Sequence, residues 1–191
     1  MSGRPPMAGH KVKPAKRPTP PHIASMLRID HAGEYGAVAI YKGQQAVFAR
    51  QGQTAHIAAQ IAEMETEEQK HLEAFDTMLV ERNVRPTALS PIWNVAGYGL
   101  GVVTALMGEK AAHACTEAVE SVIEQHYGEQ VEEVKDEDPE LAATFAEFRE
   151  DELHHKHIAV EGGAKEAAGY GLLSRVITAG CKAAIKVTSR I

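Results

Sequence analysis

The chain has 191 residues, enough for one domain to bury a sizeable hydrophobic core. Its net charge of −6 argues against general nucleic-acid binding, because phosphate backbones attract basic surfaces. Its two cysteines, Cys115 and Cys181, are too few and too isolated for a disulfide framework or a cysteine-rich metal site, so both are expected to be buried thiols.

The first 21 residues differ in composition from the rest of the chain. They hold five basic residues, six prolines and no acidic residue. Proline interrupts helices, so we predict a disordered basic tail at residues 1–22 and a single helical domain at residues 23–191. The tail matches a mitochondrial presequence poorly and has no secretory apolar core, which favours a cytoplasmic bacterial context.

Six helices are predicted, because apolar residues recur at spacings of three and four and no stretch alternates as a strand does. In chain order the predicted ranges are about 24–50, 53–82, 92–106, 109–135, 138–161 and 170–189. Asp138 before Pro139 is a helix-start signal. The protein is therefore predicted to be all-α.

A Glu-x-x-His pattern occurs twice, and each copy follows a single glutamate at nearly the same distance. On a helix this spacing places the carboxylate and the imidazole on one face, a turn apart. Four carboxylates and two imidazoles in this order are the ligand set of di-iron or di-manganese centres in helix bundles. In chain order the six candidate ligands are Glu34, Glu68, His71, Glu120, Glu152 and His155.

Both pairs occupy positions that the helical rhythm otherwise gives to apolar residues. The first stripe is Ile57, Ile61, Met64, Glu68, His71, Phe75 and Met78. The second is Phe145, Phe148, Glu152, His155 and Ala159. A single Glu-x-x-His is usually an exposed helix surface, but two copies on apolar stripes predict burial. Buried carboxylates would repel one another unless divalent cations neutralised them, and this donor set suits iron or manganese.

Two further helices are predicted to face a membrane. Residues 86–108 carry no charge, and the apolar run at 92–107 is shorter than the roughly 20 residues of a spanning helix. The last helix combines an apolar stripe with Arg175, Lys182, Lys186 and Arg190, a pattern typical of docking on an anionic membrane. The alternative is that both helices simply cover the bundle. The predicted fold is a ferritin-like four-helix bundle with two additional membrane-facing helices.

Several strings resemble the Coq7 (Cat5, Clk-1) family of demethoxyubiquinone hydroxylases, over residues 24–191. They are IDHAGEYGA at 29–37, the first Glu-x-x-His, ACTEAVE at 114–120, FREDELHH at 148–155 and AGCKAAI at 179–185. The resemblance implies a ferritin-like di-iron monooxygenase of ubiquinone biosynthesis that hydroxylates a demethoxy polyprenyl benzoquinol. It implies two Fe²⁺ ions per chain held by the six candidate ligands, with Glu68 and Glu152 bridging, and O₂ as co-substrate.

The resemblance and the two apolar helices also carry expectations about location and partners. We expect a peripheral protein on the cytoplasmic face of a bacterial inner membrane, or alternatively on the matrix side of the mitochondrial inner membrane. Expected partners are the polyprenyl quinol, the membrane surface, and either a second copy of the chain or a ubiquinone-biosynthesis complex. NADH and the quinol itself remain alternative electron donors. His126 and Tyr127 lie near enough to Glu120 to relay electrons or protons, although Tyr127 fits a core aromatic slightly better.

Two other functions fit part of the pattern. A ferritin-like protein that stores iron or reduces peroxide would need the six ligands but not the apolar helices. A non-enzymatic scaffold that binds quinones would need the apolar helices but not the carboxylates.

Overall fold

The computed structural model describes residues 18–50 and 55–190, and every regular element in them is helical. All six predicted helices are present, with ends displaced by three residues or fewer. They are α1 (Pro21–Phe48), α2 (Ala55–Glu81), α3 (Ser90–Leu106), α4 (Glu109–Val134), α5 (Pro139–Glu161) and α6 (Tyr170–Thr188), with a short 3-10 turn, η2 (Ala164–Glu166). The predicted all-α, ferritin-like architecture is confirmed.

The start of α1 falls inside the predicted tail. Pro21 and His22 already belong to the helix, because proline is tolerated at the first helical position, where no intrahelical N–H bond is needed. Residues 1–17 lie outside the described residues, so the tail itself stays a prediction.

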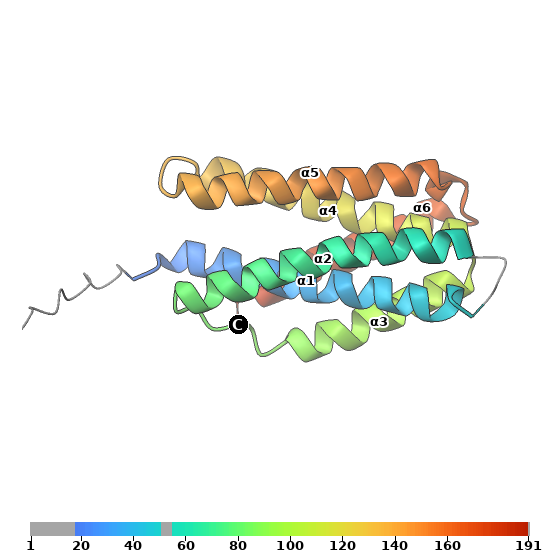
Figure 1. Ribbon diagram of the computed structural model, residues 1–191, viewed down its shortest axis with the longest axis horizontal. Coiled ribbons are helices and arrows are strands. Elements are labelled where there is room, and N and C mark those ends of the chain that lie inside the picture. Colours follow the sequence, from blue (N-terminus) through green and yellow to red (C-terminus); the bar gives the residue numbers. More distant parts are fainter. Residues whose placement is uncertain (1–17, 51–54, 191) are drawn as a thin grey trace, which may run out of the picture.

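Two helical hairpins, α1–α2 and α4–α5, form the bundle, and α3 is the connection between them (Figure 1). α3 packs mainly along α1, and α6 packs mainly along α4. The predicted helix start at α5 is confirmed, since the Asp138 carboxylate accepts a hydrogen bond from the Leu141 N–H at 3.1 Å.

Glycines let α3 approach α1 backbone to backbone. A Cβ atom built on Gly101 would lie 2.0 Å from the carbonyl oxygen of Ile40, and one on Gly97 would lie 2.6 Å from that of Gly36. From the other side, a Cβ on Gly43 would lie 2.3 Å from the carbonyl oxygen of Tyr98. Only a residue without a side chain fits at these positions.

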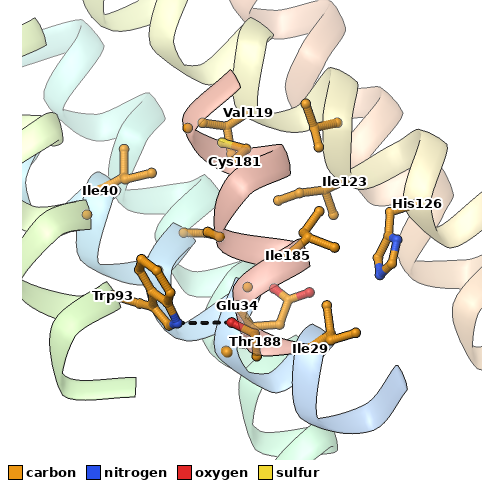
Figure 2. Close-up of a pocket in the computed structure, with 18 of the residues that line it drawn as sticks. Ile29, Glu34, Ile40, Trp93, Val119, Ile123, His126, Cys181, Ile185 and Thr188 are labelled. Atoms are coloured by element: carbon orange, nitrogen blue, oxygen red, sulfur yellow. Dashed lines mark hydrogen bonds between the residues drawn. The ribbon is translucent and has the colours of Figure 1, made fainter. Parts of the chain in front are cut away.

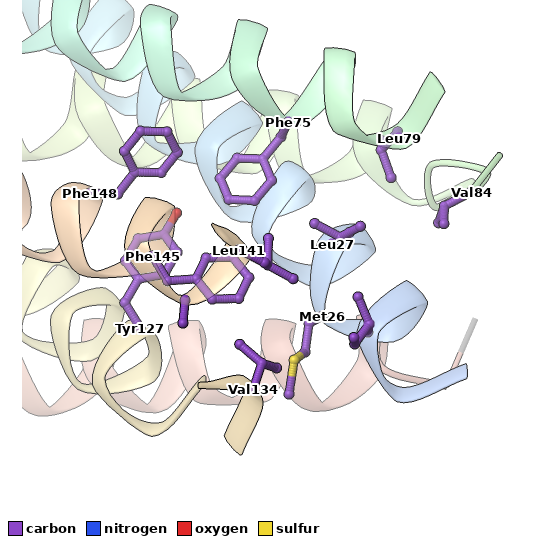
Figure 3. Packing of buried hydrophobic residues seen from close by; sticks show 12 residues of the cluster. Met26, Leu27, Phe75, Leu79, Val84, Tyr127, Val134, Leu141, Phe145 and Phe148 are labelled. Carbon is purple, nitrogen blue, oxygen red and sulfur yellow. The ribbon is translucent and has the colours of Figure 1, made fainter. Parts of the chain in front are cut away.

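The predicted apolar stripes are buried with one exception. Met78 is half-buried, and the next residue, Leu79, points into the core instead. At one end of the bundle the stripes meet in an aromatic cluster (Figure 3), made of Phe75, Tyr127, Phe145 and Phe148. This cluster closes the core next to the polar residues at mid-bundle.

The exposed large apolar side chains gather on two helices. Apart from Val80, all of those found in the described residues lie on α3, just after it, or on α6. They are Ile92, Val95, Tyr98, Val103, Leu106, Met107, Leu172, Val176 and Val187. Val176 on α6 is 62% exposed, whereas its neighbour Ile177 is buried. No helix in the described part of the chain is long and apolar enough to cross a membrane.

The α1–α3 contact yields a stability prediction. Gly101→Ala should lower the free energy of unfolding by about 1–3 kcal/mol, because the added methyl group overlaps the Ile40 carbonyl and forces the helices apart. Gly99→Ala is the matched control on the same helix: nothing lies within 4 Å of its Cβ position, and alanine favours helix. Urea unfolding followed by circular dichroism measures both. Equal stabilities of the two variants would show that the close approach does not constrain the fold.

Candidate metal centre

All six candidate ligands lie in the core at the middle of the bundle. We call them the carboxylate–histidine cluster. Each is at most 2% exposed, which is unusual for ionisable side chains. Four helices supply them: α1 and α4 contribute one glutamate each, and α2 and α5 contribute one Glu-x-x-His pair each.

The ligand atoms form two overlapping groups. In the first, atoms of Glu34, Glu68, His71 and Glu152 lie within 4.8 Å of one another, and in the second Glu120 and His155 replace Glu34 and His71. Glu68 and Glu152 belong to both groups. The geometry therefore offers two adjacent four-residue sites that share two carboxylates, which is the arrangement that bridging ligands require.

Both imidazoles turn Nδ1 toward the carboxylates. His71 Nδ1 lies 3.4 Å from Glu152 Oε1 and 3.8 Å from Glu34 Oε2. His155 Nδ1 lies 3.0 Å from Glu68 Oε1 and 3.6 Å from Glu152 Oε2. The Nδ1 atoms and the carboxylate oxygens thus converge on the same two volumes.

The residues fit a pair of metal ions. Eight buried atoms of the cluster have no hydrogen-bond partner among the described residues, although buried polar atoms almost always have one. They are Glu34 Oε2, both oxygens of Glu68, His71 Nδ1, Glu120 Oε2, both oxygens of Glu152, and His155 Nδ1. Two divalent cations would satisfy these atoms and balance four carboxylates, and oxygen and imidazole donors suit iron or manganese.

The electrostatics of the protein groups point the same way. Burial, together with repulsion from Glu152 and Glu34, raises the pKa of Glu68 well above its usual value. Burial alone would lower the pKa of His71 and His155, but the surrounding carboxylates outweigh it and raise both to about 12. Burial alone would raise the pKa of Glu152, yet the two neighbouring imidazoles outweigh it and lower this pKa to about 2. Without a cation, the raised pKa values of Glu68 and the two histidines mean that bound protons offset the buried negative charge, a role that metal ions could take over.

Two buried tyrosines hold the outer glutamates. The Tyr41 hydroxyl donates to Glu120 Oε1 at 2.6 Å, and the Tyr127 hydroxyl donates to Glu34 Oε1. Burial and the neighbouring carboxylates raise the pKa of both tyrosines well above its usual value, so both remain protonated donors. Tyr127 is a core aromatic, as favoured from sequence, and a partner of Glu34 as well. The contact of Tyr41 was not predicted, although Tyr41 follows Glu34 by two turns on the same stripe.

The other histidines near the motifs do not join the cluster. His154 and His157 are exposed. His126 instead contacts Asp30: its Nε2 is 3.2 Å from the buried Asp30 carboxylate. Burial alone would lower the pKa of His126, but hydrogen bonding to Asp30 raises it. The Asp30 carboxylate also accepts hydrogen bonds from the side chain of Gln130.

An apolar pocket adjoins the cluster. It has a volume of about 390 Å³ and lies between α1, α3, α4 and α6. Of the six cluster residues, Glu34 alone lines it (Figure 2). Tyr127 is also a lining residue. Trp93 on α3 donates a hydrogen bond from Nε1 to Thr188 Oγ1 on α6 at 3.1 Å, which ties the two outer helices together over the pocket. Most of the wall is apolar and includes Ile29, Ala37, Ile40, Leu100, Val119 and Ile185.

Comparison with known proteins gives consistent matches along nearly the whole chain. Residues 21–188 match the family described as "Ubiquinone biosynthesis protein COQ7". A Dictyostelium discoideum protein named "NADPH-dependent 3-demethoxyubiquinone 3-hydroxylase, mitochondrial" is 46% identical over 172 residues, covering 88% of this chain and 77% of that protein. The "3-demethoxyubiquinol 3-hydroxylase" of Rhodospirillum rubrum is 42% identical over 188 residues, covering 96% and 87%. A human protein with the same name as the Dictyostelium one is 42% identical over 173 residues, covering 88% and 78%.

The cluster predicts how metal binding responds to mutation. Wild-type protein titrated anaerobically with Fe²⁺ should bind two ions per chain and melt at a higher temperature when loaded. Glu152→Ala should lose at least one ion and most of this thermal shift, because it removes a carboxylate shared by both groups. Glu150→Ala, an exposed glutamate on the same helix, is the control and should behave as wild type. Wild-type protein that bound one ion or none would contradict the two-metal interpretation.

Proposed function

The chain belongs to the COQ7 family of ubiquinone biosynthesis proteins, and we propose that it is a di-iron monooxygenase that hydroxylates the ring of a demethoxy polyprenyl benzoquinol. Its relatives at 42–46% identity are named hydroxylases of the demethoxyubiquinone or demethoxyubiquinol ring. Hydroxylation is accordingly the reaction type. The proposal adds iron as the metal, O₂ as the oxidant and a membrane as the surface on which the protein acts.

The observation that supports this most strongly is the apolar pocket that reaches Glu34. At about 390 Å³ it falls in the roughly 300–1,000 Å³ range of small-molecule sites. It is large enough for a substituted ring but not for a long isoprenoid tail. We place the ring against Glu34 and Tyr127, with the tail leaving between α3 and α6 toward their exposed apolar side chains. Iron storage and peroxide reduction need no such pocket.

The proposed ligands are the six residues of the carboxylate–histidine cluster, with Glu68 and Glu152 bridging. When bound, two ferrous ions supply the reducing electrons and Lewis acidity that O₂ activation requires. Tyr41 and Tyr127 hold one oxygen each of Glu120 and Glu34, and thereby fix the orientation of these carboxylates.

The apolar wall of the pocket keeps water from the reacting ring. Hydroxylation turns a ring C–H into C–OH with one atom of O₂, while the other atom leaves as water and consumes two electrons and two protons. A nicotinamide nucleotide or the quinol itself would supply the electrons, and the relatives named NADPH-dependent favour the nucleotide.

We also propose that α3 and α6 dock on a membrane, where a polyprenyl quinol resides. Nine large apolar side chains on or next to these helices are exposed. α6 adds the basic residues Arg175, Lys182 and Lys186, and Arg190 follows just after it. Such a surface favours a peripheral position on an anionic leaflet. We propose that this leaflet is the cytoplasmic face of a bacterial inner membrane or, since some relatives are named mitochondrial, the matrix side of a mitochondrial inner membrane.

Charge on α3 should weaken membrane docking without disturbing the metal centre. Val103→Glu should reduce co-sedimentation with anionic liposomes several-fold, because a buried apolar side chain contributes on the order of 2 kcal/mol. Val80→Glu is a matched control, since Val80 is also an exposed valine but lies at the end of α2. Both variants should keep wild-type iron content. Unchanged liposome binding by a folded Val103→Glu variant, or an equal loss in Val80→Glu, would rule out docking through α3.

Isotope labelling tests the proposed reaction directly. Reduced, iron-loaded protein given a demethoxy quinol in lipid and ¹⁸O₂ should form a hydroxyquinol that carries one ¹⁸O atom, detected by mass spectrometry. A parallel reaction in H₂¹⁸O under unlabelled O₂ should leave the product unlabelled. If the new hydroxyl oxygen came from water, or if no product formed despite full iron loading, the monooxygenase proposal would be wrong. Peroxide reduction or iron storage would then be supported instead.

A further inference from the structure

Two acidic residues outside the carboxylate–histidine cluster bind the outward-facing nitrogens of its imidazoles. His155 Nε2 lies 2.7 Å from Glu67 Oε2, and His71 Nε2 lies 3.0 Å from Asp151 Oδ2. Both bonds cross between helices, from α5 to α2 in the first case and from α2 to α5 in the second. The carboxylates make no other hydrogen bond or ion pair within the described residues.

The two contacts follow one sequence rule. Glu67 directly precedes the glutamate of the first Glu-x-x-His, and Asp151 directly precedes that of the second. One residue is about 100° of helical rotation, so the preceding acid points away from the shared centre and toward the neighbouring helix. α2 and α5 run in opposite directions (Figure 1), so each extended motif supplies the carboxylate to which the imidazole of the other motif donates a hydrogen bond. The repeated unit is therefore acid-Glu-x-x-His.

The hydrogen bonds define how the imidazoles present themselves to the centre. A carboxylate that accepts a hydrogen bond from Nε2–H leaves Nδ1, on the cluster side, as the nitrogen that would bind a metal ion. Glu67 and Asp151 have 42% and 48% of their side-chain surface exposed, so they accept these bonds while remaining hydrated. They thus orient buried groups without adding buried charge.

We propose that Glu67 and Asp151 are positioning residues of the metal centre, each fixing the tautomer and ring orientation of the histidine on the opposite helix. The inference rests on the two-metal centre of the proposed function. Because each acid serves one histidine, it also assigns each acid to one of the two sites: Glu67 to the site of His155 and Asp151 to the site of His71.

The test is an anaerobic titration of the full chain with Co²⁺, whose visible absorption reports ligand geometry. Glu67→Ala and Asp151→Ala should each bind one ion as the wild type does and the other about 10- to 100-fold more weakly, with altered absorption for the weaker ion alone. Glu67→Gln and Asp151→Asn keep an acceptor without its charge and should fall between wild type and alanine. The melting temperature without added metal should hardly change, because half-exposed pairs contribute little.

The chain offers a matched control in Asp76→Ala. His31 Nε2 lies 3.0 Å from Asp76 Oδ1, so this pair has the same geometry and a buried histidine, but it does not belong to the cluster. Its loss should leave both Co²⁺ ions bound as in wild type. Wild-type affinity at both sites in the Glu67 and Asp151 alanine variants, or an equal loss in Asp76→Ala, overturns the positioning role alone. A wild type that binds no pair of ions overturns the centre and this inference together.

Discussion

Four carboxylates buried beside two imidazoles are the constraint on which the rest of this structure depends. An isolated ionised carboxylate is too costly to keep in a protein core, and the eight unpartnered atoms of the cluster concentrate that cost at mid-bundle. Protein groups relieve part of this cost, because two tyrosines bind the outer glutamates and two imidazoles face the shared ones. Two cations between the helices would offset the remaining cost of the buried carboxylates. Metal binding would therefore stabilise the packing of the bundle.

The same constraint explains how the helices are distributed. α1, α2, α4 and α5 must surround the cluster, so the connection between the hairpins cannot pass through it. α3 instead runs along the outside of α1, held close by glycines. Together with α6 it encloses an apolar pocket beside Glu34. The connection between the two hairpins, which the topology requires, thus forms one wall of the pocket. A lipid-soluble ring in this pocket could approach the centre.

The helices and the six cluster residues could be predicted from sequence because both depend on periodicity within one helix. A glutamate on a stripe of buried apolar residues is conspicuous wherever it occurs. The pocket depends on how α3 and α6 pack against other helices, which spacing along one helix does not specify. The roles of Glu67 and Asp151 could not be predicted for a related reason. In sequence, half-exposed acidic residues on a helix resemble ordinary solvated residues, and only the packing of the opposite helix shows their histidine partners. The shift from Met78 to Leu79 shows that a strict stripe also fails near the end of a helix.

The central claim is that the shared carboxylates of this bundle hold two iron ions side by side. Anomalous scattering at the iron absorption edge, from crystals loaded with Fe²⁺ under anaerobic conditions, tests it most directly. The account predicts two peaks between α1, α2, α4 and α5, one next to His71 and one next to His155, with Glu68 and Glu152 reaching both. A single peak, or peaks bound only to exposed acidic residues, would contradict it.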